Sequence, residues 1–180
     1  MYDTGKGVAV DHRRAFELYD RAAGRGSAQG MYNKGCAYRD GEGVEVSLAS
    51  AFYWFRVAAS RGHRGGQYNT GCMLANGDGA PRNLVEARSY FEKAAAQGHA
   101  DARIAIPHVD RDIQKSLDQL NATIEGGGQG PERAELERQR QELAAALARA
   151  VPPPVATSGS PPLSRSGHNL SADAERPMQP

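Results

Sequence analysis

One segment of this sequence occurs three times at a spacing of 36 residues. The copies align without gaps as GKGVAVDHRRAFELYDRAAGRG, GEGVEVSLASAFYWFRVAASRG and GDGAPRNLVEARSYFEKAAAQG, which occupy 5–26, 41–62 and 77–98. Each copy opens on a glycine turn, continues as an amphipathic helical pattern and closes on a glycine. A fixed period of 20 to 50 residues indicates stacked repeats in which each unit packs on its neighbours. A chain of this kind is suited to holding a partner along an extended surface.

The positions that recur in the copies each have a structural role. The Gly-x-Gly turn lets the chain reverse sharply, because glycine adopts a positive φ without steric cost. A good N-cap residue stands before the helix, and an aromatic residue lies three positions before a pair of alanines on the same helical face. The N-caps are Asp11, Ser47 and Asn83, and the aromatic residues are Tyr19, Phe55 and Phe91.

The register of the repeat predicts two helices in each copy, which we term A and B. Helix B follows the Gly-x-Gly turn, and helix A lies between the closing glycine of one copy and the turn of the next. We expect A helices over about 27–40 and 63–76, a partial third one from near His99, and B helices over about 11–25, 47–61 and 83–97.

Two stretches of the middle copies resemble the Sel-one-like repeat family, a branch of the tetratricopeptide-type solenoids. They are A-x-x-x-Y-N-x-G-x-x-Y-x-x-G-x-G-V over Ala28–Val44 and SLASAFYWFRVAASRG over Ser47–Gly62. The resemblance extends over about Tyr2–Ala105. It implies an all-α fold, a right-handed superhelical solenoid of antiparallel helix pairs with about three repeats. The sequence departs from the family at Lys34 and Thr70, where the family usually has leucine.

The changes of composition predict three parts of the chain. The solenoid occupies 1–106, and its first repeat is truncated, so we expect the sequence to be a fragment or a truncated gene model. A helical extension occupies 107–150, with helices over about 110–125 and from 131 that form a hairpin or short coiled coil, joined by a glycine-rich linker at 126–130. Pro107 breaks the repeat pattern or kinks the helix. The Pro- and Ser-rich tail 151–180 is predicted to be disordered.

The balance of charges excludes several classes of partner. There are 22 Lys and Arg residues against 21 Asp and Glu residues, so we expect neither a nucleic-acid nor a membrane partner. No apolar run is long enough to span a bilayer, and no apolar leader opens the sequence, which favours a cytoplasmic location. Cys36 and Cys72 lie one repeat apart, too far for a disulfide, and are expected to be thiols in a reducing compartment.

The sequence contains none of the common catalytic or metal-binding motifs. There is no HExxH, C-x-x-C, Walker loop or G-x-S-x-G. His63 and His99 recur at the junction between copies and are interpreted as helix caps. We therefore predict no catalytic residue, no metal site and no cofactor.

The A helices offer the candidate binding surface. In tetratricopeptide-type solenoids they line the concave face, which takes up a peptide or a helix. We predict that Arg39 is the strongest contact, because its fork can bind a carboxylate of the partner. The alternative is that Arg39 and Asp40 form only a solvated rim. The predicted partner-binding residues are Gln29, Tyr32, Asn33, Arg39, Asp40, Tyr68, Asn69 and Asn76.

The resemblance implies a non-catalytic protein-protein interaction module, an adaptor or scaffold. One alternative is an enzyme that binds or hydrolyses β-lactams, as in a cysteine-rich branch of the family. That branch has two bridged cysteines in each repeat, whereas this chain has one. Another alternative is oligomerisation, or docking, through the helix at 131–150.

Overall fold

The computed structural model describes residues 11–126 and 131–149, and within these ranges all regular structure is helical. The predicted tail 151–180 and most of the predicted linker 126–130 lie outside the described residues. The helices are α1 (His12–Gly24), α2 (Ala28–Asp40), α3 (Leu48–Ser60), α4 (Arg64–Asn76), α5 (Leu84–Ala96), α6 (Ala100–Glu125) and α7 (Pro131–Ala148).

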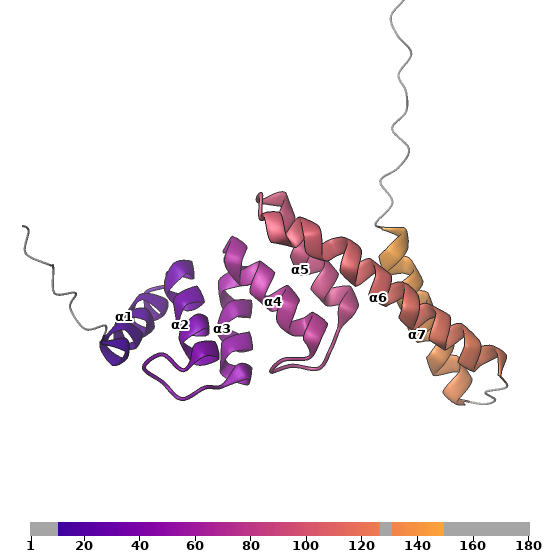
Figure 1. Ribbon diagram of the computed structural model, residues 1–180, viewed down its shortest axis with the longest axis horizontal. Helices are drawn as coiled ribbons and strands as arrows, with labels where there is room; N and C mark the ends of the chain where they lie inside the picture. The colour runs from indigo at the N-terminus through magenta and orange to yellow at the C-terminus, as the bar shows by residue number, and fades with distance from the viewer. Residues whose placement is uncertain (1–10, 127–130, 150–180) are drawn as a thin grey trace, which may run out of the picture.

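The helices form a solenoid, as the period predicts. α1 to α5 stand in a row in chain order, and each packs against the next (Figure 1). The B helices are α1, α3 and α5, and the A helices are α2, α4 and the beginning of α6. The N-caps predicted for the B helices are confirmed. The side chains of Asp11, Ser47 and Asn83 each accept a hydrogen bond from the backbone N–H three residues on.

Glycines on the A helices fix how closely the helices stack. Phe55 is fully buried against Gly35, and a Cβ atom at Gly35 would lie only 2.7 Å from the Phe55 ring. Phe91 packs against Gly71 in the same way, at 2.8 Å. Real Cβ atoms almost never approach this closely, so only glycine lets the aromatic ring of the following B helix fill this space. The recurring glycine and the recurring aromatic residue are therefore two sides of one contact.

The linking turns pack just as tightly. Gly43 and Gly79 have φ angles of +75° and +71°. A Cβ atom at Gly43 would lie 2.1 Å from the carbonyl oxygen of His12, and one at Gly79 would lie 2.3 Å from that of Leu48. Each turn therefore lies directly on the first residues of the preceding B helix, which holds successive copies in register.

α6 differs from the prediction of two separate segments. It is one helix of 26 residues that continues through Pro107. Proline has no N–H to donate to the carbonyl of Arg103, and it usually ends or kinks a helix. Here Pro107 is exposed, while Ala102, Val109 and Ile113 are buried against the neighbouring helices. Tertiary packing on both sides of the proline therefore keeps the helix continuous.

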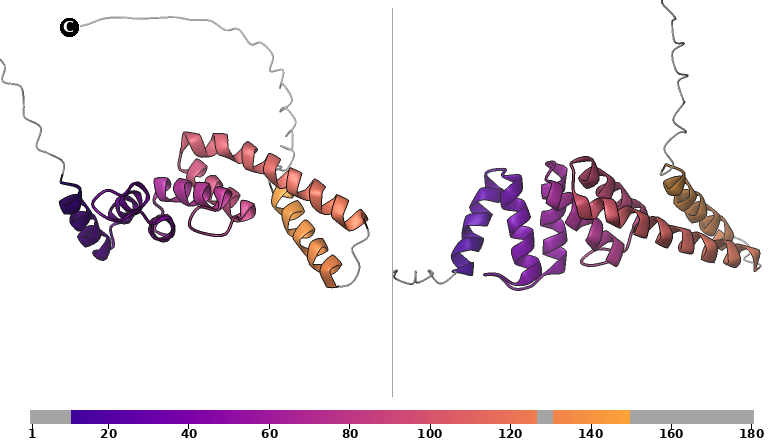
Figure 2. Two further views of the ribbon diagram at one scale, coloured as in Figure 1. Left: turned by 60° about the horizontal axis from the view of Figure 1, so that its bottom comes forward. Right: turned by 45° about the horizontal axis from the view of Figure 1, so that its top comes forward.

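α7 folds back along α6 and forms the predicted hairpin (Figures 1 and 2). Ala146 is buried, and Leu143 and Leu147 are partly buried, in a single cluster that also contains Leu84 of α5 and Ile113 of α6. The last repeat and the extension thus share one core, and residue 106 lies within both a continuous helix and that core. The predicted domain boundary has no counterpart in a break of the helix.

Two buried positions carry polar side chains in place of leucine. Lys34 is 8% exposed, and its ammonium group lies 4.0 Å from the centre of the Trp54 ring and pairs with Asp20. Thr70 is fully buried, and its hydroxyl donates to the carbonyl oxygen of Gly66 at 2.7 Å. Both polar groups are therefore satisfied within the repeats, which explains why the A helices tolerate them.

Candidate functional site: the A face

The predicted site residues all lie on the A helices α2 and α4. Those of α2 and α4 define the surface that we call the A face: Gln29, Tyr32, Asn33, Arg39, Asp40, Tyr68, Asn69 and Asn76. The same repeat positions continue onto α6. There, Ile104 follows Tyr68 after one period, and Asp112 follows Asn76.

Two stacked ring pairs hold the A helices against one another. The His63 ring stacks on Tyr32, with ring centres 4.5 Å apart, and the His99 ring stacks on Tyr68 at 4.3 Å. Both histidines occupy the N-cap position of the next A helix. The predicted role as a cap is confirmed for His63, whose Nδ1 accepts from Gly66 N–H at 3.0 Å, but His99 makes no side-chain cap hydrogen bond.

The hydrogen bonds of His63 define its state. Because Nδ1 accepts from the helix, the proton of the neutral ring lies on Nε2, which donates to Gln29 Oε1 at 3.1 Å. Burial, and then the nearby charge of Arg64, lowers the pKa of His63. His63 is therefore a neutral structural link between α2 and α4.

Two hollows open on the A face. The first has a volume of about 590 Å³ and is lined by Gln29, Tyr32, His63, Arg64, Gln97 and His99, together with two glycines. The second has a volume of about 530 Å³, and its polar lining comes from Cys72, Asn76, Arg82, His108 and Asp112. The structure thus brings Gln29 and Tyr32 together at one hollow and places Asn76 at the other.

The Arg39 side chain is already engaged by its neighbour. Its Nε and Nη2 each donate to one carboxylate oxygen of Asp40 at 2.8 Å, and both side chains are about 42% exposed. These hydrogen bonds raise the pKa of Arg39 and lower that of Asp40. A partner carboxylate at Arg39 must therefore displace Asp40 or share the guanidinium with it.

The three asparagines of the A face differ in their hydrogen bonding. Asn33 accepts from Gln29 Nε2 at 2.8 Å, and Asn76 donates to Asp78 at 3.1 Å. The Nδ2 atom of Asn69 is buried and has no hydrogen-bond partner among the described residues. Asn69 also lies beside the Tyr32 hydroxyl, whose pKa is raised chiefly by burial and is lowered in part by Arg39 and Asn69.

The two cysteines are free and half-buried. Burial raises the pKa of the Cys36 and Cys72 thiols, so they are protonated at neutral pH and are weak nucleophiles. The adjacent phenol of Tyr68 also has a raised pKa, of about 12, chiefly because of burial. Within residues 11–126 and 131–149, no cluster of three or more His, Cys, Asp or Glu side chains could hold a metal ion.

The residues that α6 and the turn before α5 contribute to this surface were not among those predicted from the sequence. His108 and Asp112 line the second hollow, and Arg82 lies there too, with its Nη2 3.6 Å from Asp112. Extending the repeat register by one more period past Pro107 would have found His108 and Asp112, because they correspond to Cys72 and Asn76.

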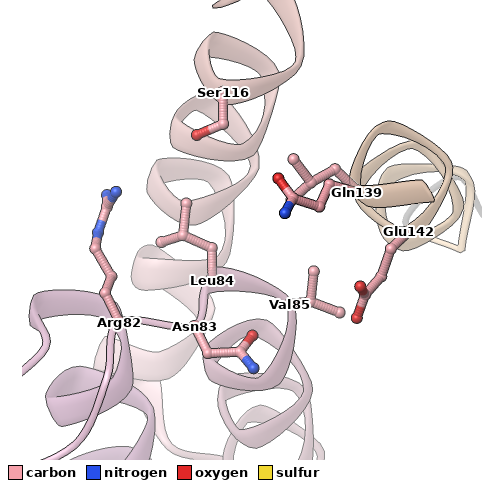
Figure 3. A pocket seen from close by; sticks show the side chains of 8 residues that line it. Arg82, Asn83, Leu84, Val85, Ser116, Gln139 and Glu142 are labelled. Carbon is pink, nitrogen blue, oxygen red and sulfur yellow. The ribbon is translucent and has the colours of Figure 1, made fainter. Parts of the chain in front are cut away.

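A third hollow lies off the A face, where α7 meets the last repeat (Figure 3). Leu84 and Val85 at the start of α5 face Gln139 and Glu142 of α7, and Ser116 of α6 completes the lining on one side. Its volume is about 330 Å³.

Across the described helices, none is both long and apolar enough to cross a membrane.

A family model described as the Sel1 repeat matches residues 1–27, 28–63 and 65–99. The chain belongs to the Sel1 repeat family. The second match contains α2 and α3, and the third contains nearly all of α4 together with α5, so each of these two repeats is one A–B helix pair. Proteins of this family generally act as protein-interaction modules and are typically without catalytic activity. No curated protein matches the chain.

Two solved structures of Sel1 repeat proteins are similar to this one. A Sel1 repeat protein from Oxalobacter formigenes is 34% identical, with a TM-score of 0.54, over 58% of this chain and 31% of its own. The protein c5321, described as a protective antigen of uropathogenic Escherichia coli strains with an SLR fold, is 30% identical, with a TM-score of 0.50, over 79% of this chain and 28% of its own. The chain thus spans less than a third of the length of either protein.

Proposed function

We propose that the A face binds a peptide or a helix of a protein partner, and that the chain acts as an adaptor or scaffold without catalysing a reaction. The observation that supports this most directly is the placement of polar residues that packing does not require. Tyr32 and Tyr68 recur because they stack on the next histidine. Gln29 and Arg39 do not recur, since Gly65 and Ala75 stand one period later.

The chemistry of the A face suits a polypeptide ligand. An extended peptide presents backbone N–H and C=O groups in alternation and needs both acceptors and donors from its receptor. Side-chain amides supply both, and Gln29, Asn33, Asn69 and Asn76 are distributed over the A helices α2 and α4.

A peptide-display selection on the purified chain tests this proposal. Selected peptides should lose at least about tenfold in affinity when Asn33→Ala and Asn76→Ala are combined. Both side chains bond only to residues within four positions in sequence, so their removal leaves the stack intact. Gln119→Ala is the matched control, because it removes an exposed amide from the part of α6 beyond the repeats. Equal loss in the control, or no loss in the double variant, would contradict the A face as the binding surface.

No specific observation favours the alternative functions. The leucines Leu143 and Leu147 of α7 pack on the core that α6 shares, so the apolar stripe at 131–150 is already used within the chain. The second and third repeats each have a single free cysteine, and the first has none, whereas the cysteine-rich branch needs a bridged pair in each repeat.

A further inference from the structure

One arginine of the A face has no carboxylate partner among the described residues. The arginines that lie on this face or line its two hollows are Arg39, Arg64 and Arg82. Arg39 is paired with Asp40, and Arg82 donates to a backbone carbonyl oxygen at 2.8 Å. Arg82 also lies 3.6 Å from Asp112. Within the same residues the guanidinium of Arg64 makes a single long hydrogen bond, to the Gln97 carbonyl oxygen at 3.5 Å, so most of its donors remain available.

The packing of the repeats does not account for an arginine at position 64. Ala28 and Ala100 occupy the same position one period earlier and one period later, each as the first residue of an A helix. Arg64 is likewise the first residue of α4, and its side chain is exposed. Since the other two A helices begin with alanine, the stack forms there without a guanidinium.

Arg64 supplies the formal charge of the first hollow of the A face. This hollow has a volume of about 590 Å³, and among the described residues no Asp, Glu or Lys and no other Arg lines it. The amides in the lining are already engaged. Gln29 Nε2 donates to Asn33 at 2.8 Å, and Gln97 Nε2 donates to Gln67 at 2.7 Å. A ligand in this hollow therefore meets the donors of the guanidinium, which pair most strongly with a negatively charged acceptor.

The position of the hollow favours a side chain of a bound polypeptide over its terminus. α4 stands between the other two A helices, α2 and α6 (Figure 1). The lining comes from all three repeats, with Gln29 on α2, Arg64 on α4 and His99 just before α6. A polypeptide that lies along the A face therefore passes Arg64 in the middle of its chain, where only side chains carry carboxylates.

We propose that Arg64 binds the carboxylate of an Asp or Glu side chain of the partner in the first hollow of the A face. The planar guanidinium presents paired N–H donors that match the two carboxylate oxygens. The proposal rests on the proposed function, because it names the chemistry of the partner at the same surface. It assigns the carboxylate to Arg64 in place of Arg39, whose donors are paired with Asp40.

Peptides selected from a random library on the purified full chain test this assignment. We expect them to share one internal Asp or Glu. Replacing that residue by Asn or Gln should lower the affinity for the original chain at least about tenfold, because hydrogen bonds between charged groups are the strong ones. The same replacement should have almost no effect on binding to Arg64→Ala. This variant should fold normally, because Ala28 and Ala100 already occupy the position in the other A helices.

A reversal of charge and a matched control complete the experiment. Arg64→Glu should bind peptides in which Lys replaces the shared acid more tightly than the original peptides. The control combines Arg39→Ala with Asp40→Asn, which gives α2 the side chains that α4 carries at Ala75 and Asn76. This control should keep the full dependence on the acid of the peptide, whatever its effect on the overall affinity.

Four outcomes would contradict the proposal. Equal dependence on the acid in Arg64→Ala, or loss of that dependence in the control, would overturn the assignment to Arg64. A loss of affinity on amidation of the peptide C-terminus, with no effect at an internal acid, would show that a terminal carboxylate is bound. Peptides that require Asn33 and Asn76 but contain no acid would overturn this inference alone. Peptides indifferent to Asn33 and Asn76 would contradict the proposed function as well.

Discussion

At the scale of single residues, substitutions at three glycines can distinguish two effects on the free energy of unfolding: that of a left-handed backbone and that of a close contact. Gly24 is helical, and a Cβ atom there would have no neighbour within 4 Å; Gly62 has a φ of +79° and similarly open surroundings. Gly43 combines a φ of +75° with a contact of 2.1 Å to the His12 carbonyl oxygen. The series therefore adds first a left-handed φ and then a close contact.

We expect alanine to affect the free energy of unfolding in a graded way. Gly24→Ala should raise it by up to about 1 kcal/mol, because glycine is a poor helix former. Gly62→Ala should lower it by about 1–2 kcal/mol, the cost of a left-handed conformation. Gly43→Ala should lower it by about 2–5 kcal/mol, since overpacking adds about 1–3 kcal/mol. Denaturant titration measures all three, and equal effects at Gly43 and Gly62 would show that the turn does not pack on α1.

The role of a side chain could be predicted from the sequence where that role follows from its position in the repeat. The capping roles of Asp11, Ser47 and Asn83 follow from their position before each B helix, and the structure confirms them. The pairing of Arg39 with Asp40 could not be predicted, because it depends on side-chain conformation and not on the register of the repeat. The sequence also gave no reason to pair Lys34 with Asp20 and Trp54, since those residues are brought together only by the stacking of α1, α2 and α3.

At the scale of elements, the helices inside the period could be predicted and α6 could not. The glycines that recur every 36 residues mark the ends of α2 to α5 in the sequence, and the observed ends lie within about two residues of the predicted ones. Pro107 instead suggested an interruption between 106 and 110. The buried residues on either side of it outweigh the local preference of proline, and no local pattern reveals such tertiary packing.

This account of α6 predicts that Pro107→Ala stabilises the chain. Alanine restores an N–H that can donate to the Arg103 carbonyl group, and it removes the clash of the ring with the preceding turn. Because Pro107 is exposed, no core contact is lost. We expect the free energy of unfolding to rise by about 1–3 kcal/mol, measured by thermal and denaturant unfolding. Ala105→Gly, also within α6, is the reverse control and should destabilise; a loss of stability in Pro107→Ala would mean that α6 depends on a kink.

At the scale of the whole molecule, the packing divides into overlapping clusters along the row of helices. Met31 lies in a cluster with Ala23 and Ala58, near the first helices. Leu117 lies in the cluster that joins α5, α6 and α7 through Leu84 and Ala146. In repeat proteins each unit contacts only its neighbours, so stability is approximately a sum of local terms and interface terms. The shared core therefore makes the extension an energetic part of the last repeat.

Hydrogen exchange on two matched core variants tests this coupling. Leu117→Ala should cost about 2–5 kcal/mol and should weaken the protection of α5 amides as well as those of α6 and α7, because all three helices bury side chains in the same cluster. Met31→Ala removes a side chain of similar size from the other end and should weaken α1 to α3 while leaving α7 nearly unchanged. If Leu117→Ala left the protection of α5 intact, the extension would be an independent unit, and the domain boundary predicted near residue 106 would be supported.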